Sequence, residues 1–335
     1  MGWWQIDADT LAGSRFVVSP LAETIASLKA LERGTAAHAG AHPGERAWLD
    51  AHLPAYRARQ AADPVTALLV RSAFGRAWNA DFITPTPSPP GGGDSDGRPA
   101  FEDEIVRVRE TPPERVRDDL LLSLEGPVPA ALHRSDLGER AATVLEWVWT
   151  QAVLPYWPRR RRLIEADVVA RTAQLSQGGW ASALSAMRPG MRWLGGSRLQ
   201  INTHGGRSQV IPGVRLMFVP VTPHTGWVSW DANRYAVVYP CAGALADTGR
   251  ARVPEPLRAL LGPARAGVLV LLGAPKSTTQ LVALTGQGLG SVGRHLKVLL
   301  DAGLIRRRRA GRSVLYFRTE AGEALVRAGG PETGP

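Results

Sequence analysis

The spacing of apolar side chains predicts helices over much of the first 190 residues. Within 20–31, leucine or isoleucine at positions 21, 25, 28 and 31 falls on one helical face. Ser19 can cap this helix, and Pro20 suits its first turn. The same reasoning predicts further helices over 113–124, 137–153 and 158–175 and a short piece at 181–187. Ser135 or Asp136 can cap the helix over 137–153.

The pattern changes after Pro189. Short runs of β-branched and aromatic residues follow, separated by Gly, Pro, Asn and Asp, and they predict strands. The predicted strands are 192–193, 199–202, 209–211, 216–221, 226–230 and 235–239. Consecutive short strands with turn residues between them are typical of an antiparallel meander. The sequence therefore predicts an N-terminal α+β region, helical first and then a small antiparallel sheet.

The last 80 residues predict a different order of elements. A helical stretch over 256–272, broken near Gly262, precedes a short helix over 279–284 that Ser277 or Thr278 can cap. A glycine-rich turn leads to a helix over 289–301, which Gly303 ends. Two strands, 304–306 and 314–317, and a helix over 320–326 complete the region. Helix, short helix, turn, helix and basic hairpin is the order of a winged helix-turn-helix domain.

Proline and glycine divide the chain into expected domains. The segment 84–99 (TPTPSPPGGGDSDGRP) cannot hold a helix or a central strand, so we expect a mobile loop there. A second such stretch, 244–256, marks the expected boundary. We therefore expect a sensor or dimerisation domain over 1–250, a winged helix-turn-helix domain over 256–328 and a flexible tail over 329–335.

Composition excludes several classes of protein. Of the 335 residues 44% are apolar and 21% charged, which is unlike a disordered polycation. A single cysteine, Cys241, excludes a disulfide framework and a thiolate zinc site within one chain. No apolar run reaches the roughly 18 residues of a membrane helix, and the start lacks a basic signal region. The expected location is the cytoplasm, with no membrane partner.

The net charge of +10 is concentrated at one end of the chain. Residues 251–335 carry 13 basic and 5 acidic side chains, or +8, whereas the first 250 residues carry only +2. Such asymmetry is typical of a module that binds a polyanion. The four arginines at 159–162 form a second basic run, which suits either a phosphate contact or a solvated helix start paired with Glu165 and Asp167.

The residues that carry this charge predict a DNA-binding surface. If the apolar face of 289–301 packs inward, its other face offers Gly290, Ser291, Gly293, Arg294 and Lys297 to a major groove. The hairpin offers Arg309 and Arg312 to the neighbouring backbone or minor groove. Some of Arg306 to Arg308 should instead contact acids or the protein itself, since they alternate between the faces of a strand.

Four segments resemble ArsR-type winged-helix regulators: LGPARAGVLVLL at 261–272, TQLVAL at 279–284, SVGRHLKVLLDAGLI at 291–305 and RAGRSVLYF at 309–317. The resemblance implies a homodimer that binds operator DNA and usually represses. It implies base-reading roles for Leu289, Gly290, Ser291, Gly293 and Arg294, with Lys297 at phosphate. The metal-sensing members carry a cysteine pair where this chain has residues 278–280 (TTQ), so metal sensing at that site is not expected. The N-terminal half resembles an uncharacterised actinobacterial domain, notably over 155–168.

Other groups of residues give weaker indications of a metal, ligand or nucleotide site. His38 and His42 have the spacing of a metal pair on a helix, but Gly40 and Pro43 favour a surface loop. The tryptophans suit either an aromatic ligand pocket or an ordinary core. The glycine-rich 286–290 lacks a P-loop lysine, and no catalytic motif is present. We therefore expect no cofactor, no metal and no enzymatic activity.

The sequence as a whole predicts a transcriptional regulator, with double-stranded DNA as partner, a homodimer as the binding form and an unidentified small-molecule effector. The alternatives are an enzyme or small-molecule binder whose winged helix binds protein, and a nonspecific architectural DNA binder. A pocket with strongly shifted pKa values would favour the former, and equal affinity for random and promoter DNA the latter.

Overall fold

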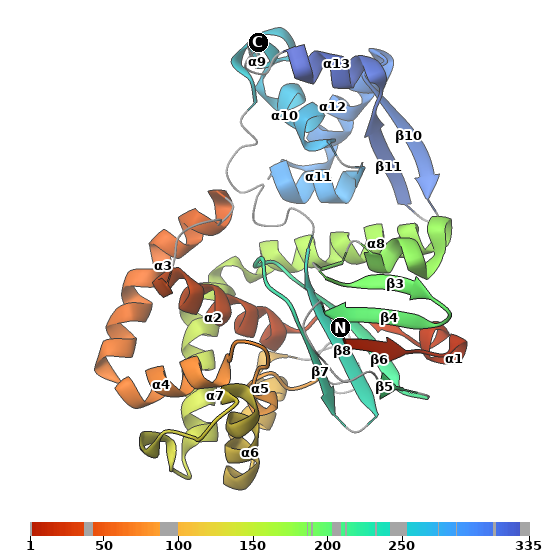
Figure 1. Ribbon diagram of the computed structural model, residues 1–335. Helices are drawn as coiled ribbons and strands as arrows, with labels where there is room; N and C mark the ends of the chain where they lie inside the picture. The colour runs from red at the N-terminus through yellow and green to blue at the C-terminus, as the bar shows by residue number, and fades with distance from the viewer. Residues whose placement is uncertain are drawn as a thin grey trace, which may run out of the picture. The chain divides into compact units, whose positions relative to one another are not determined.

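In the computed structural model the chain separates into two compact units (Figure 1). The N-terminal unit comprises 1–158 and 184–242, and the C-terminal unit comprises 159–183 and 243–335. The structure describes residues 2–36, 43–87, 100–185, 187–188, 190–202, 209–211, 213–231, 233–241, 253–273, 275–285, 287–310 and 313–328.

The helices of the N-terminal unit include the predicted ones and others that the pattern missed. The predicted ones are α2 (Pro20–Ala36), α6 (Pro113–Leu124) and α7 (Leu137–Val148), the last continuing as a π-helix over Trp149–Val153. The longer additional helices are α3 (Pro43–Ala62), α4 (Pro64–Ala73) and α5 (Phe101–Arg109). A short α1 (Ala8–Ala12) and 3₁₀ turns at Asp81–Ile83, Ala130–Leu132 and Leu154–Tyr156 complete the helical part.

Polar groups fix the start of α2. Ser19 caps it as predicted, since its Oγ accepts a hydrogen bond from the Ala22 N–H at 2.9 Å. Glu104, 85 residues further along the chain, accepts from the Ser19 hydroxyl at 2.7 Å and from the Leu21 N–H at 2.9 Å. A carboxylate from α5 therefore satisfies a backbone donor at the helix N-terminus, where negative charge is stabilised.

The predicted antiparallel meander is wrong. The strands form two four-stranded sheets of mixed direction, in the orders β3-β4-β1-β5 and β2-β6-β8-β7. β8 lies between β7 and β6, antiparallel to the first and parallel to the second, so consecutive strands do not all pair. Two strands near the N-terminus, which the pattern did not predict, join the sheets. The strands are β1 (Gly2–Gln5), β2 (Arg15–Phe16), β3 (Arg192–Gly195), β4 (Arg198–Asn202), β5 (Gln209–Val210), β6 (Arg215–Val221), β7 (Trp227–Asp231) and β8 (Arg234–Pro240).

The core of the N-terminal unit joins its helices to the second sheet (Figure 1). Side chains of α2 to α7 are buried together with Met217, Val219 and Val238 of β6 and β8. Within this core Trp149 stacks on Phe101 with ring centroids 4.8 Å apart. These tryptophan contacts fit an ordinary aromatic core.

A long helix, α8 (Trp157–Ser185), contributes to both units. It unites the helices predicted at 158–175 and 181–187, with a kink at Gly179, whose φ of 64° lies in the left-handed region that favours glycine. Most of α8 belongs to the C-terminal unit, although the sequence assigned this segment to the domain over 1–250.

The C-terminal unit closely follows its prediction. Its helices are α9 (Glu255–Leu261), α10 (Pro263–Leu271), α11 (Thr278–Thr285), α12 (Leu289–Asp301) and α13 (Glu320–Ala328). The hairpin strands β10 (Ile305–Ala310) and β11 (Ser313–Arg318) pair with each other, and β11 also pairs with a short β9 (Lys276–Ser277) that the pattern did not predict.

Several predictions fall on segments that lie outside the described residues. These are the loop expected at 84–99 from residue 88 onward, most of the boundary expected at 244–256, the tail 329–335 and the histidine pair at 38 and 42. None of the helices in the described ranges combines the length and the apolar character needed to cross a bilayer.

The buried Glu104 makes the stability of the N-terminal unit depend on pH. Burial, the largest cause, raises the pKa of this carboxyl from 4.5 to about 7, although the hydrogen bonds from Leu21 and Ser19 oppose the shift. Because the pKa of Glu104 is higher in the folded state than in the unfolded state, its protonation stabilises the folded state. This stabilisation is complete below about pH 4.5 and is lost as the pH rises through about 7. We predict that the free energy of unfolding of the wild type, measured relative to that of Glu104→Gln, falls by on the order of 3 kcal/mol between pH 4.5 and pH 7.

Tryptophan fluorescence during urea unfolding measures this difference, because ten of the eleven tryptophans belong to the N-terminal unit and only Trp180 lies in the α8 segment of the C-terminal unit. Parallel pH curves for wild type and Glu104→Gln would contradict the assignment.

Candidate nucleic-acid interface

One face of α12 is buried and thereby fixes the orientation of the helix. Val292, Leu296 and Leu299 are at most 1% exposed and lie in one apolar cluster with residues of α10 and α11. These three positions follow the three- and four-residue spacing that places side chains on one helical stripe. The opposite stripe of α12 therefore points to solvent.

The outward stripe of α12 carries the predicted cationic residues. Gly290, Arg294 and Lys297 recur at helical spacing, and all three are exposed. Neither Arg294 nor Lys297 forms an ion pair with any described residue. A Cβ built on Gly290 or Gly293 meets no atom within 4 Å, so the two glycines leave the helix backbone accessible from outside. This stripe can approach an anionic surface closely.

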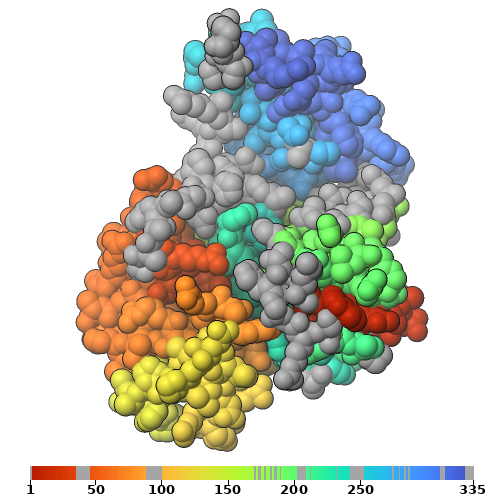
Figure 2. Space-filling view, in the orientation of Figure 1, coloured from red at the N-terminus to blue at the C-terminus, as the bar shows by residue number. Residues whose placement is uncertain are grey.

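The hairpin adds a second row of free cations. Arg306, Arg307, Arg308 and Arg309 of β10 are all exposed, and the blue part of the chain to which they belong is seen at the surface in Figure 2. The Arg306 guanidinium lies 5.7 Å from the centre of the Phe317 ring, as expected for a residue that contacts the protein itself. None of the four forms an ion pair within the described part of the chain.

Other arginines in this protein have a structural role, because they form ion pairs and hydrogen bonds within their own unit. In the N-terminal unit Arg109 pairs with Glu139 and Glu146, and Arg140 pairs with Asp63 and Asp136. In the C-terminal unit Arg318 donates to the Leu269 carbonyl at 2.7 Å and pairs with Glu323. Arg294, Lys297 and Arg307 to Arg309 have no such partner among the described residues, so their charge is available to an external anion.

The remaining predicted residues differ in their placement. Leu289 is 64% exposed at the start of α12. Ser291 is only half-buried, but its hydroxyl already lies 3.2 Å from Gln287 Oε1 and 3.3 Å from His295 Nε2, so it does not project freely as a base-reading position would. Arg312 lies outside the described residues.

Arg307 and Arg308 were not among the predicted site residues. Some of Arg306 to Arg308 were expected to contact acids or the protein itself; Arg306 does so at Phe317, whereas Arg307 and Arg308 are exposed and form no ion pair with any described residue. The sequence could have indicated their exposure, because four arginines follow one another at 306–309 and the strand opposite them contains no acid. The facing residues are Phe317, Tyr316, Leu315 and Val314.

The surroundings of His295 on α12 disfavour its charged form. Desolvation, together with the charges of Arg265 and Arg294, lowers the pKa of His295 below its usual value. The lasting positive charge of this helix is therefore that of Arg294 and Lys297.

Reciprocal hydrogen bonds hold the helix that precedes α12. The Ser277 N–H donates to Gln280 Oε1 at 2.8 Å, and the Gln280 N–H donates to Ser277 Oγ at 3.2 Å, which is a capping box at the start of α11. Gln280 Nε2 also donates to the Ala166 carbonyl of α8 at 3.0 Å. The predicted cap at Ser277 is confirmed, and it also connects α11 to the α8 segment of the same unit.

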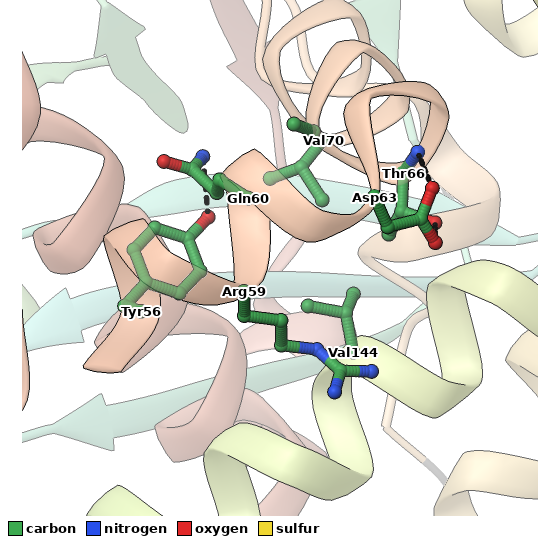
Figure 3. Close-up of a pocket in the computed structure, with 8 residues that line it drawn as sticks. Tyr56, Arg59, Gln60, Asp63, Thr66, Val70 and Val144 are labelled. Atoms are coloured by element: carbon green, nitrogen blue, oxygen red, sulfur yellow. Dashed lines mark hydrogen bonds between the residues drawn. The ribbon is translucent and has the colours of Figure 1, made fainter.

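The N-terminal unit offers a small hollow beside α3, α4 and α7 (Figure 3). Its empty volume of about 240 Å³ includes open solvent, whereas ligand pockets enclose roughly 300–1,000 Å³. Its polar groups already have partners: the Tyr56 hydroxyl donates to Glu32 at 2.5 Å, and Asp63 caps α4 through the Thr66 N–H at 3.1 Å. This hollow is a feature of local packing and gives no argument for a ligand.

The described residues contain no group of three or more His, Cys, Asp or Glu side chains placed to hold a metal ion. Cys241 is buried, with 6% of its surface exposed.

Gly290 and Gly293 should lower the stability of α12. We predict that Gly290→Ala and Gly293→Ala each stabilise α12 by roughly 1 kcal/mol, because alanine is the better helix former and the added Cβ meets nothing. Hydrogen exchange of the backbone amides over 289–301, followed by mass spectrometry, measures this. Faster exchange in either variant would show that the glycine is required within the fold.

Comparison with known proteins shows that one segment of this unit is similar to a known family. The model for bacterial regulatory proteins of the arsR family matches residues 263–307, which extend from the start of α10 into β10. No curated protein and no solved structure matches the chain significantly. The C-terminal unit therefore contains an ArsR-type helix-turn-helix domain, and this type of domain points to DNA binding in transcription regulation.

Proposed function

We propose that the protein is a sequence-specific transcriptional regulator, a repressor that binds operator DNA as a homodimer. In this proposal α12 enters the major groove, and the hairpin β10–β11, hereafter the wing, contacts the adjacent backbone or minor groove. The N-terminal unit dimerises the protein, senses a small molecule, or does both.

The observation that carries the proposal is the free cationic stripe on the helix of an ArsR-type domain. Arg294 and Lys297 are exposed on α12, and the domain match covers that whole helix. A charged group that lacks a partner within the fold is available to DNA phosphate, which supplies most of the affinity of such proteins. Gly290 and Leu289 lie near the N-terminal end of α12, where recognition helices contact base edges.

The wing extends the same electrostatic surface. Arg307, Arg308 and Arg309 add three exposed cations beside α12, and Arg312 belongs to the same proposed contact by its position in the sequence. Phosphate contacts fix the register of a protein on DNA, whereas base contacts give sequence preference. We therefore assign affinity mainly to the cations and specificity to the exposed positions from 289 to 294.

The homodimer and the repressor role rest on the resemblance to ArsR-type regulators. A twofold protein matches an inverted repeat whose half-sites lie about one helical turn apart. A soluble cytoplasmic protein without cofactor or resident metal fits this role, and no catalytic activity is part of the proposal.

We predict that Arg294→Ala combined with Lys297→Ala weakens operator binding and flattens its salt dependence. Each lost phosphate contact lowers the slope of log K against log salt by about 0.9, so two contacts in each protomer of a dimer lower it by roughly 3–4. Fluorescence anisotropy of labelled operator DNA over a salt series measures the slope.

The matched control removes two exposed arginines from the N-terminal unit, Arg46→Ala with Arg117→Ala. It changes the net charge equally and should leave the slope within experimental error. A slope that is unchanged in the α12 variant, or equally reduced in the control, would contradict the assignment.

Gly290→Ala tests whether the backbone of α12 approaches DNA closely. We predict at least a tenfold loss of operator affinity, because the added methyl group separates the helix from the groove, in a protein whose α12 is more stable. Anisotropy and hydrogen exchange on the same preparation separate the two effects. Unchanged affinity would indicate that Gly290 faces away from DNA.

A further inference from the structure

Four consecutive arginines, 159–162, lie in the first two turns of α8, in the part of the helix that belongs to the C-terminal unit. The run is divided between the interior and the surface. Arg160 is 2% exposed, Arg159 and Arg161 are half-buried, and Arg162 is exposed. The sequence left two roles open for this run, a phosphate contact or a solvated helix start with acidic partners, and the side-chain contacts distinguish these roles residue by residue.

Two arginines of this run lack an acidic partner. Arg161 pairs with Glu165, with its Nε 3.1 Å from Oε1. Neither Arg159 nor Arg162 forms an ion pair or a hydrogen bond with any described residue. These two are three positions apart, which places them beside each other on the surface of a helix. Their charges are therefore available to an anion outside the chain.

The spacing of these charges is unfavourable without such an anion. Burial, followed by the charges of Arg160 and Arg162, lowers the pKa of Arg159. Like charges one turn apart destabilise a helix, because they repel each other. Asp167, the other acid expected to pair with this run, lies 3.7 Å from Arg171 and pairs with neither Arg159 nor Arg162. A bound anion would offset the repulsion.

A hydrogen bond joins this part of α8 to the helix-turn-helix of the same unit. Gln280 Nε2, at the start of α11, donates to the Ala166 carbonyl at 3.0 Å. Ala166 is four residues after Arg162, which is about 6 Å along the helix axis. In helix-turn-helix proteins the second helix lies in the major groove and the first, here α11, crosses the DNA backbone. Arg162 is therefore about one helical turn from the contact with the helix that is expected to lie over phosphates.

We propose that Arg159 and Arg162 contact the phosphate backbone of DNA beside α11, and so extend the DNA-binding surface beyond the segment at 263–307 that matches the arsR family. This inference rests on the proposed function. A guanidinium group suits phosphate, because its planar donors can form two parallel hydrogen bonds to one anion. Phosphate contacts carry no sequence information directly. The two arginines should therefore add affinity for all duplex DNA without changing the preference for the operator.

Arg159→Gln combined with Arg162→Gln tests the contact in the full-length protein. Two lost phosphate contacts in each protomer of a dimer should lower the slope of log K against log salt by roughly 3–4. Raising the salt from about 50 mM to about 200 mM should then weaken operator binding by the wild type on the order of 100-fold more than binding by the variant. Fluorescence anisotropy with operator DNA and with random DNA of equal length measures this, and the ratio of the two affinities should stay within twofold of wild type.

Arg162→Gln and Arg161→Gln form a matched pair of single variants, since each removes one charge from neighbouring positions of α8 and Arg161 is held by Glu165. Arg162→Gln should lower the slope by roughly 2, and Arg161→Gln should leave it within experimental error. Equal slopes of the two variants would overturn the proposal. Tighter operator binding by Arg162→Gln would also overturn it, because the start of α8 would then oppose DNA binding. Arg162 is exposed, so this pair keeps the test valid even where the double variant fails to fold.

Hydroxyl-radical footprinting at saturating protein separates this contact from those of α12. The double variant of α8 should lose protection of sugars in each half-site, at positions other than those lost by Arg294→Ala with Lys297→Ala. If only the α12 variant changes the slope and the footprint, the proposed function stands and this inference is overturned. If neither variant changes them, both are contradicted.

Discussion

The C-terminal unit depends on the burial of one stripe of α12. Val292, Leu296 and Leu299 remove their side chains from water against α10 and α11, and each full burial of this kind contributes roughly 1.5–3 kcal/mol. Because a helix is rigid, burying these positions also fixes the direction of Gly290, Arg294 and Lys297. The apolar seam therefore both stabilises the unit and orients the residues proposed to meet DNA.

Local polar contacts hold the neighbours of this seam in place. The capping box of Ser277 and Gln280 starts α11. After α12, Gly303 at φ 69° lets the Leu304 N–H reach the Leu299 carbonyl at 3.0 Å, which closes the helix with a Schellman motif. Arg318 joins β11 to the end of α10. The exposed cations of α12 and β10, by contrast, form no ion pair with any described residue.

Prediction from sequence succeeded where the determining contacts are local. The bounds of α6 and α12, the caps at Ser19 and Ser277 and the terminating Gly303 all follow from residues a few positions apart. It failed where they are distant: pairing of β6 with β8 and capping of α2 by Glu104 depend on segments that meet only after folding. For the candidate site, the exposed cations of α12 were predicted, whereas the bonds that hold Ser291 depend on side-chain orientation, which spacing does not specify.

The charge divides the chain into two parts: residues 1–250 are nearly neutral at +2 and include arginines held in ion pairs, whereas residues 251–335 carry +8, with exposed cations on α12 and β10. The most direct test of the central claim is sequencing of genomic fragments that the purified full-length protein retains from fragmented DNA of its own source. The account predicts a small set of enriched fragments that share a short inverted repeat. Recovery of fragments in proportion to their abundance, without a shared repeat, would contradict it.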